Sequence, residues 1–184
     1  MKRFMGVMVL VLLPIPGGCQ GSVLDNSVWG SAAKVAGLDV STFYGIAVQE
    51  SGMRWADGSF RPWPWTLSLN EGSRRVKKGP RHYASKAAAV AALRGFVRDG
   101  ITNIDVGLMQ VNLRWHGHRV HYDLNVLLEP TANIMAAASY LGEIEANSSQ
   151  EKLSAYHAPK KPVRGNAYAN RVNHFSRIIH DKIR

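Results

Sequence analysis

The sequence predicts a mostly helical α+β domain that carries one small β-hairpin. Helical periodicity and capping residues recur along most of the 184-residue chain, and hydrophobic residues make up 46% of it, enough for a core. The segment 59–81 differs, because its prolines, aromatic residues and alternating pattern lead into the turn signal Asn70-Glu71-Gly72. The length suits one domain of ordinary size, which we expect at 23–184.

Capping residues and glycines delimit the expected helices. Ser27 opens the first helix and Gly37 ends it, Ser41 caps the second and Gly52 stops it, and Ser85 caps an alanine-rich third helix. Residues 101–116 are expected to form a loop with short turns. The six expected helices are 27–35, 42–51, 86–99, 130–146, 150–157 and 167–183.

Residues 1–22 are predicted to be a secretory signal peptide. Two positive residues precede an apolar run at 4–15, which is short for a membrane span, and Pro16-Gly17-Gly18 breaks it. A retained N-terminal anchor is the alternative. Cys19, the only cysteine, leaves open a lipoprotein signal and a lipid anchor, although Pro16 stands where such signals usually have leucine. We therefore expect export to the periplasm, with or without membrane attachment.

The formal net charge of +10 is concentrated in two blocks. Residues 73–98 hold eight Lys and Arg and no acid, and residues 151–184 hold eight more with two acids. Such blocks favour a polyanionic partner, or they are solvated faces. Nucleic acid, anionic lipid and the acidic peptides of a cell wall are candidate partners. Expected export argues against intracellular nucleic acid, and no nucleic-acid recognition motif is present.

Glu50 is a carboxylate on an apolar helix face. Phe43, Ile46 and Ala47 share its face by helical spacing. A carboxyl in an apolar setting has a raised pKa, because desolvation disfavours the charged form, and a raised pKa suits a general acid near neutral pH. The alternative is that Glu50, at the helix end, reaches water or Arg54. Periodicity alone favours that alternative.

A second run, Asp105-Val106-Gly107-Leu108-Met109-Gln110-Val111-Asn112, combines a glycine with amides among apolar neighbours. Gly107 indicates a tight backbone site. Gln110 and Asn112 alternate with apolar residues, so their amides could share one direction. Amides in a cleft suit the acetamido and hydroxyl groups of sugars, but buried amides also bond to backbone.

Glu50-Ser51 followed by Gly107-Leu108-Met109-Gln110 resembles the signature of lytic transglycosylases with the SLT domain, whose fold is similar to goose-type lysozyme. Asn133-Ile134, Tyr140-Leu141 and Ala155-Tyr156-His157-Ala158 follow in the family's order, and the resemblance covers 43–168. Pro62-Trp63-Pro64-Trp65-Thr66-Leu67, with Asp105-Val106, resembles transglycosylases carried by conjugative and integrative elements.

Three features depart from the family pattern. Glu50 and Gly107 are unusually far apart in the chain, and the hairpin and alanine-rich helix fill the gap. His157 replaces the usual asparagine. Pro159-Lys160-Lys161-Pro162 replaces a glycine-rich continuation, which puts in doubt how that wall of the cleft binds glycan.

The resemblance implies cleavage of the β-1,4 bond between N-acetylmuramic acid and N-acetylglucosamine in peptidoglycan, without a cofactor. Glu50 would protonate the leaving oxygen, and the muramic 6-hydroxyl would close on C1 to leave a 1,6-anhydro end. Because the substrate supplies the nucleophile, no second carboxylate is needed, unlike in ordinary glycosidases. A conjugation or secretion apparatus is the implied partner.

The resemblance also assigns roles to the neighbours of Glu50. Tyr156 is expected to hold Glu50, and Ser51 either orients the muramic group or caps the helix. Asp105 either serves as an auxiliary carboxylate or forms hydrogen bonds that fix the loop carrying Gly107. The expected substrate-binding residues are Gly107, Met109, Gln110, Asn112 and Tyr140.

Several alternatives stay open at this point. Trp63 and Trp65 either stack on sugars or pack under the hairpin. His116, His118 and His121 lack a partner cluster, so no metal site is expected. The rival functions are a muramidase, which uses water as nucleophile, and a non-enzymatic wall-binding scaffold.

Overall fold

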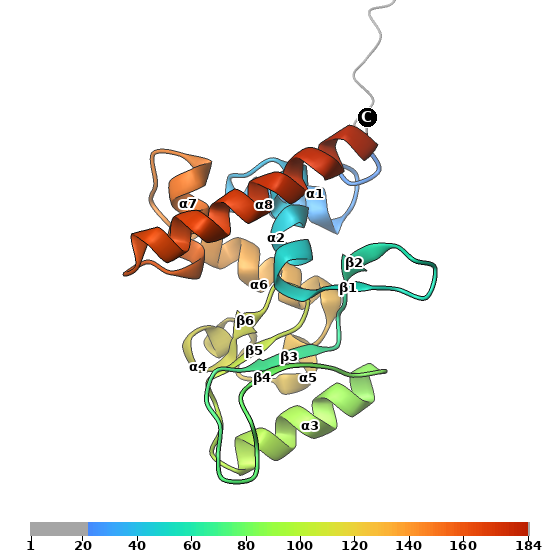
Figure 1. The fold of residues 1–184 in the computed structure, drawn as a ribbon, viewed down its shortest axis with the longest axis vertical. Coiled ribbons are helices and arrows are strands. Elements are labelled where there is room, and N and C mark those ends of the chain that lie inside the picture. Colours follow the sequence, from blue (N-terminus) through green and yellow to red (C-terminus); the bar gives the residue numbers. More distant parts are fainter. Residues whose placement is uncertain (1–21, 184) are drawn as a thin grey trace, which may run out of the picture.

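A computed structural model describes residues 22–183 and places a group of helices at one end and the larger sheet, together with the alanine-rich helix, at the other (Figure 1). Residues 1–21 of the predicted signal peptide, which include Cys19, lie outside the described residues. None of the helices in the described range is long and apolar enough to cross a bilayer. The helical end comprises α1 (Val28–Ala36), α2 (Val40–Ser51), α7 (Ser149–His157) and α8 (Pro162–Ile183), and α6 (Pro130–Glu143) lies between the two ends.

Local capping explains where the N-terminal helices begin and end. The Ser27 hydroxyl accepts from the Trp29 N–H at the start of α1, and Gly37 ends that helix in the left-handed conformation, with φ of 66°. The prediction that Ser41 caps α2 is wrong. The Asp39 carboxylate accepts from the Thr42 N–H at 2.9 Å instead, so α2 begins two residues earlier and Ser41 is buried.

The later helices are confirmed, with shifted ends. Ser85 caps α3 (Lys86–Arg98) as predicted. The helix expected at 130–146 ends at Glu143, and the last helix begins at Pro162, five residues before the expected start. A proline fits the first helical turn, because its missing N–H has no intrahelical partner there, so Pro162 starts α8 without a cost.

The predicted hairpin consists of two separate strand pairs. β1 (Gly52–Arg54) pairs with β2 (Phe60–Pro62), directly after α2. β3 (Thr66–Leu69) pairs with β4 (Gly79–His82), so an antiparallel hairpin does form, with a long connecting loop.

The expectation of a loop at 101–116 is wrong in part. β5 (Ile104–Val106) pairs with the free edge of β3, and β6 (Val111–Asn112) pairs with β5, giving a four-stranded sheet of order β4-β3-β5-β6. Strands this short show no clear alternation of two residues, so the pattern could not identify them. The short helices α4 (Leu113–His116), η1 (Gly117–Val120) and α5 (Leu124–Leu127) follow.

The core is built around α2, which packs against α8. A Cβ on Gly45 would lie 3.1 Å from the Val172 carbonyl oxygen, so a glycine permits this close approach. Phe43, Ile46 and Ala47 are fully buried. Because these three residues fix the orientation of α2, they also fix the direction of Glu50, which follows on the same face.

Candidate active site

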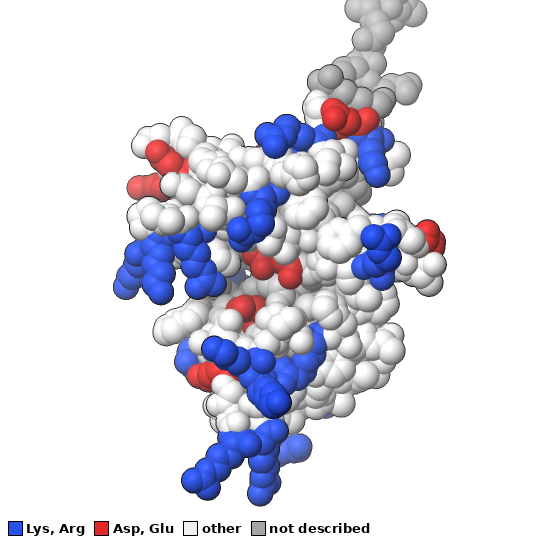
Figure 2. Space-filling model, viewed as in Figure 1, with Lys and Arg blue, Asp and Glu red and all other residues white. Residues whose placement is uncertain are grey.

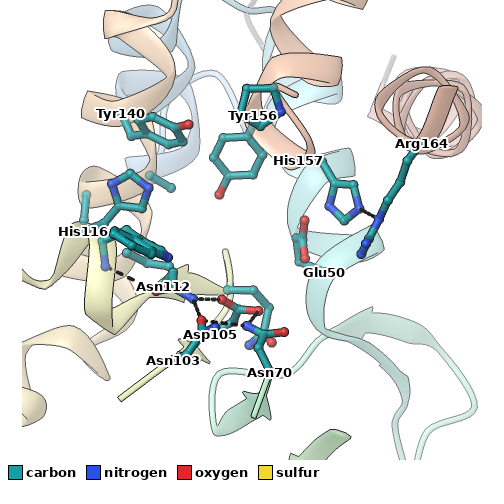
Figure 3. Close-up of a pocket in the computed structure, with 16 residues that line it drawn as sticks. Glu50, Asn70, Asn103, Asp105, Asn112, His116, Tyr140, Tyr156, His157 and Arg164 are labelled. Atoms are coloured by element: carbon teal, nitrogen blue, oxygen red, sulfur yellow. Dashed lines mark hydrogen bonds between the residues drawn. The ribbon is translucent and has the colours of Figure 1, made fainter. Parts of the chain in front are cut away.

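A cavity of about 570 Å³ lies between the helical end and the sheet (Figure 3). Its walls come from the end of α2, the sheet, α4, α6, α7 and the start of α8. Glu50 and Asp105 are the acidic residues that line it. Figure 2 shows acidic side chains inside the central hollow and Lys and Arg side chains on its borders.

Glu50 lies one residue before the C-terminal end of α2, where the buried face of the helix reaches the cavity. The pKa of its carboxyl is raised from 4.5 to about 7, chiefly by burial and to a smaller extent by the negative charge of Asp105. Tyr168 and Arg171 act in the opposite direction. At neutral pH the carboxyl therefore exists in both forms, so it can give up a proton and take one back.

Tyr168, on α8, is the residue beside Glu50 that the sequence argument missed. Its hydroxyl is buried and makes no hydrogen bond of standard geometry, yet its interaction with the carboxyl lowers the pKa of Glu50. Gly165, Tyr168, Ala169 and Val172 form the buried face of α8 at helical spacing. A tyrosine on such a face needs a polar partner, which is the signal that could have identified it.

Asp105 faces the cavity from the middle of β5, opposite the α2 wall (Figure 3). Its two carboxylate oxygens accept hydrogen bonds of 2.7 Å from Asn70 Nδ2 and Asn112 Nδ2. Burial raises the pKa of Asp105, and the two amide bonds lower it. Asp105 thus fixes the strand ends and also presents a carboxylate to the cavity, so the geometry accommodates both roles considered for it.

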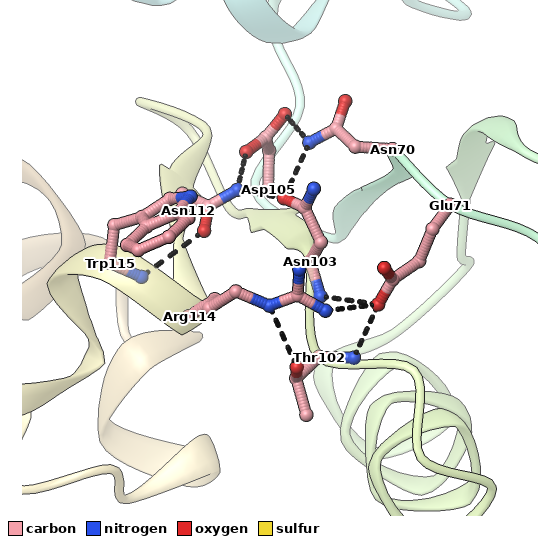
Figure 4. Close-up of polar contacts among 8 residues, drawn as sticks. All are labelled: Asn70, Glu71, Thr102, Asn103, Asp105, Asn112, Arg114 and Trp115. Carbon is pink, nitrogen blue, oxygen red and sulfur yellow. Dashed lines mark hydrogen bonds and ion pairs between the residues drawn. The ribbon is translucent and has the colours of Figure 1, made fainter.

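Further contacts, centred on Glu71, lie next to Asp105 and the Asn70 and Asn112 amides that bind it (Figure 4). One carboxylate oxygen of Glu71 accepts from the backbone N–H groups of Thr102 and Asn103, each at 3.1 Å, and from Arg114 Nη2 at 2.5 Å. These bonds lower the pKa of Glu71. The sheet side of the cavity, called its floor below, is therefore held by a carboxylate that stays ionised.

The turn at 107–110 is held from three sides. Gly107 has φ of 81°, and a Cβ there would lie 2.6 Å from the Asn133 side-chain amide. Asn133, which is buried, accepts from the Met109 N–H at 2.8 Å and donates to two backbone carbonyls. The Ser51 hydroxyl donates to the Leu108 carbonyl at 2.8 Å, which ties the end of α2 to this turn.

These contacts change the roles expected for several predicted residues. Gly107, Met109 and Ser51 are buried and do not line the cavity, so they act on the shape of the turn. Tyr156 lines the cavity, but its hydroxyl donates to the Met109 carbonyl at 2.9 Å rather than to Glu50. The tyrosine whose hydroxyl interacts with the Glu50 carboxyl and lowers its pKa is Tyr168.

Two predicted amide residues do line the cavity. Gln110 has φ of 48°, and its Nε2 donates to the carbonyls of Gly107 and Thr66, at 2.9 and 3.2 Å. Asn112 bonds Asp105 through its amide nitrogen, while its oxygen accepts from the Trp115 N–H and caps α4. The amide nitrogens of Gln110 and Asn112 are thus both bonded within the protein, where they hold the floor of the cavity in place.

Aromatic side chains form one side of the cavity. Tyr140 lies between His116 and Tyr156, with ring centroids 4.1 and 5.5 Å away. Burial, with the nearby Arg119, lowers the pKa of His116 to about 4, so its ring is neutral. No three His, Cys, Asp or Glu side chains within 22–183 are grouped to hold a metal ion.

The exposed aromatic residue at the cavity is Trp115, which sequence reasoning did not select. Its side chain is 64% exposed and lines the cavity from α4. Trp63 and Trp65 pack elsewhere: Trp63 meets Trp55 edge to face and donates to the Tyr83 carbonyl, and Trp65 packs against the core. Of the two alternatives for Trp63 and Trp65, the structure therefore shows packing, and neither residue lines the cavity.

A comparison with models of known protein families finds a match. The model of the transglycosylase SLT domain matches residues 27–176, which include every wall of the cavity. Searches of curated proteins and of solved structures each gave no significant match. The resemblance to this family is confirmed, whereas the closer likeness to enzymes of conjugative elements stays a prediction. The chain therefore belongs to the transglycosylase SLT domain family, lysozyme-like α+β enzymes that act as lytic transglycosylases on peptidoglycan glycan strands.

Proposed function

We propose that Glu50 is the single catalytic acid and base of this enzyme, and that the reaction leaves a 1,6-anhydro-muramic end. The observation that carries the proposal is the position of Glu50. Its carboxyl has a pKa of about 7 and lines the cavity at the end of an otherwise apolar helix face. A group with a pKa near the working pH is suited to transfer a proton in both directions.

In the proposed reaction, protonated Glu50 donates its proton to the oxygen that links muramic C1 to the next sugar, and this bond breaks. The oxygen of the muramic 6-hydroxyl then forms a bond to C1. Its proton passes to the Glu50 carboxylate, which restores the acid. No water is consumed, so the reaction needs neither a second carboxylate nor an activated water.

Hydrolysis by water is the second candidate, and one observation favours it. Asp105 presents a carboxylate to the cavity across from Glu50. Glycosidases that use water employ such a pair. Against this, both oxygens of Asp105 are already engaged by Asn70 and Asn112, which favours an orienting and electrostatic role.

We further propose that sugars lie along the amide floor and the aromatic side of the cavity. Gln110 and Asn112 border the floor, while Trp115 and Tyr140 offer apolar ring faces. Amphipathic sugar rings pack on aromatic faces, and a sugar hydroxyl can donate to an amide oxygen at the edge, here that of Gln110, whose nitrogen is already engaged. The Trp115 ring is the strongest support, because it lines the cavity and is 64% exposed, so a sugar ring can reach its face.

The predicted signal peptide and the wall substrate together support export to the periplasm as part of this proposal. The resemblance of 62–67 to transglycosylases of conjugative elements supports a role in opening the wall locally for a conjugation or secretion apparatus. A lipid on Cys19 would hold the enzyme at the membrane, and intact-mass measurement of the mature protein tests it.

The test is digestion of purified sacculi by the mature chain, with mass spectrometry of the released fragments. We expect anhydro-muropeptides from the wild type and none from Glu50→Gln, with sacculus binding retained by the variant. Glu145→Gln removes an exposed carboxylate and serves as the matched control. Release of reducing ends alone would establish the muramidase, and binding without any release would establish the scaffold.

A further inference from the structure

The turn between α7 and α8 carries a group of cations at the edge of the cavity. Lys160 and Lys161 lie between Pro159 and Pro162, and the Lys161 N–H donates to the Ala158 carbonyl at 3.0 Å, which closes the turn. Both lysines are exposed. Pro159 and Arg164, on either side of them, line the cavity. Figure 2 shows Lys and Arg side chains extending beside the central hollow at this end of α8.

These cations have no acidic neighbours in their own segment. The sequence from 152 to 180 contains no Asp or Glu, and none of the ion pairs among the described residues involves Lys160, Lys161 or Arg164. A solvated face usually mixes both signs of charge, whereas an unbalanced group beside a binding cavity favours an anionic ligand.

Arg164 is held in place by a stacked pair of rings. Its Nε donates to His157 Nε2 at 3.2 Å (Figure 3). The His157 ring stacks on Tyr168, with centroids 4.3 Å apart and planes 1° from parallel. His157 can accept this bond only when it is neutral, and burial together with Arg164 and Arg171 lowers its pKa. The bond uses Nε, so the terminal Nη groups stay available for a ligand.

The sign of the charges indicates which part of a glycan strand would meet this turn. The sugars of a peptide-bearing strand are uncharged, because each muramic carboxyl is joined to its peptide as an amide, so cations gain little from them. The peptides attached to muramic acid end in carboxylates. Glu50 and Asp105 make the interior of the cavity acidic, and they would repel such a carboxylate toward the edge.

We propose that Lys160, Lys161 and Arg164 bind the carboxylates of the peptide substituents on the strand, so that the enzyme prefers peptide-bearing to peptide-free glycan. This inference rests on the proposed function, because it takes the cavity as the glycan site. Arg164 pairs with one carboxylate through its terminal nitrogens, and the two lysines add charge at the same edge. This role would explain why the turn carries two lysines where the family pattern is rich in glycine.

The test measures binding in the Glu50→Gln background, where no strand is cut. The probes are glycan strands from sacculi with their peptides intact, and the same strands after an amidase has removed the peptides and the lactyl carboxylates thus exposed have been converted to amides, so that the second probe is uncharged. We expect the peptide-bearing strand to bind about tenfold more tightly at low salt, with the preference shrinking as salt rises. In Lys160→Gln/Lys161→Gln the ratio of the two affinities should fall to about twofold.

A matched control removes the same charge elsewhere. Lys77→Gln/Lys78→Gln alters two exposed lysines in the β3–β4 loop and should keep the preference. Equal binding of both strands by the parent, or an unchanged ratio in the Lys160/Lys161 variant, would overturn the inference. It would also be overturned if that variant kept the ratio and lost only adherence to phosphatidylglycerol vesicles.

The same experiment separates this inference from the proposed function. A binding preference that depends on Lys160 and Lys161, found together with reducing ends as the only products, would refute the anhydro reaction alone. Anhydro products from the active enzyme without any binding preference would refute the peptide site alone.

Discussion

Replacing Glu50 with glutamine should make the domain more stable, by an amount that grows with pH. The carboxyl has a pKa of about 7 in the folded protein, against an ordinary value of 4.5. Between these two values the folded state keeps a proton that the unfolded state has released, so the free energy of unfolding falls as pH rises. At about 1.4 kcal/mol per pH unit, the loss reaches about 3 kcal/mol above pH 7.

Glutamine does not titrate, so the Glu50→Gln variant avoids this loss while keeping the side chain's size. The stability difference between variant and wild type should therefore be about 3 kcal/mol larger at about pH 8 than at about pH 4. For a domain of this size, that corresponds to a rise in the relative Tm of about 6–12 °C.

Urea denaturation at both pH values, followed by circular dichroism, measures the difference directly. Glu145→Gln, at an exposed position, reports the effect of removing one negative charge. A Glu50→Gln stability difference that stays the same at both pH values would refute the reasoning, because it would mean that the carboxyl is not desolvated in the folded protein.

Three further predictions concern the neighbours of Glu50 and the turn beside it. Tyr168→Phe removes an interaction that lowers the pKa of Glu50, so the alkaline limb of the kcat/KM profile, at about pH 7 in the wild type, should move to higher pH. Asp105→Asn removes a charge that raises this pKa, so the limb should move to lower pH. Its rate loss at about pH 5 should stay within about tenfold, whereas Glu50→Gln should lose about a thousandfold. A thousandfold loss in Asp105→Asn would instead assign the second carboxylate a direct part in the chemistry. Gly107→Ala should cost about 3 kcal/mol in unfolding measurements, because a positive φ and a close approach both oppose a Cβ there. Gly58→Ala, with φ of 80° and open space around it, should cost only about 1 kcal/mol, and equal costs would show that the close approach is unimportant.

The features that could be predicted from sequence are those set by neighbours along the chain. Ser27, Ser85 and the apolar spacing before Glu50 gave the early helices and the direction of the carboxyl, because caps and helical faces depend on residues a few positions apart. The family signature then indicated that this carboxyl is a catalytic acid. The sheet could not be predicted in the same way. β3 pairs with β5 some distance along the chain, through strands only three or four residues long.

The partner of Glu50 shows the same limit at the level of one residue. The motif around Tyr156 indicated a hydroxyl that holds the acid. The fold instead places this hydroxyl on the Met109 carbonyl and brings Tyr168, on the next helix, to the carboxyl. Which tyrosine reaches Glu50 depends on how α7 and α8 pack against α2, and no local pattern carries that information. The hydrogen bond of Ser51 to Leu108 depends on the same packing.

The central claim is that Glu50 acts alone and that the substrate's own 6-hydroxyl is the nucleophile. Digestion of sacculi in water labelled with heavy oxygen tests it most directly. The account predicts anhydro-muramic products with no label in the newly formed ends, and no products at all from Glu50→Gln. Label at muramic C1 in the wild-type products would show that water is the nucleophile, and it would contradict the account.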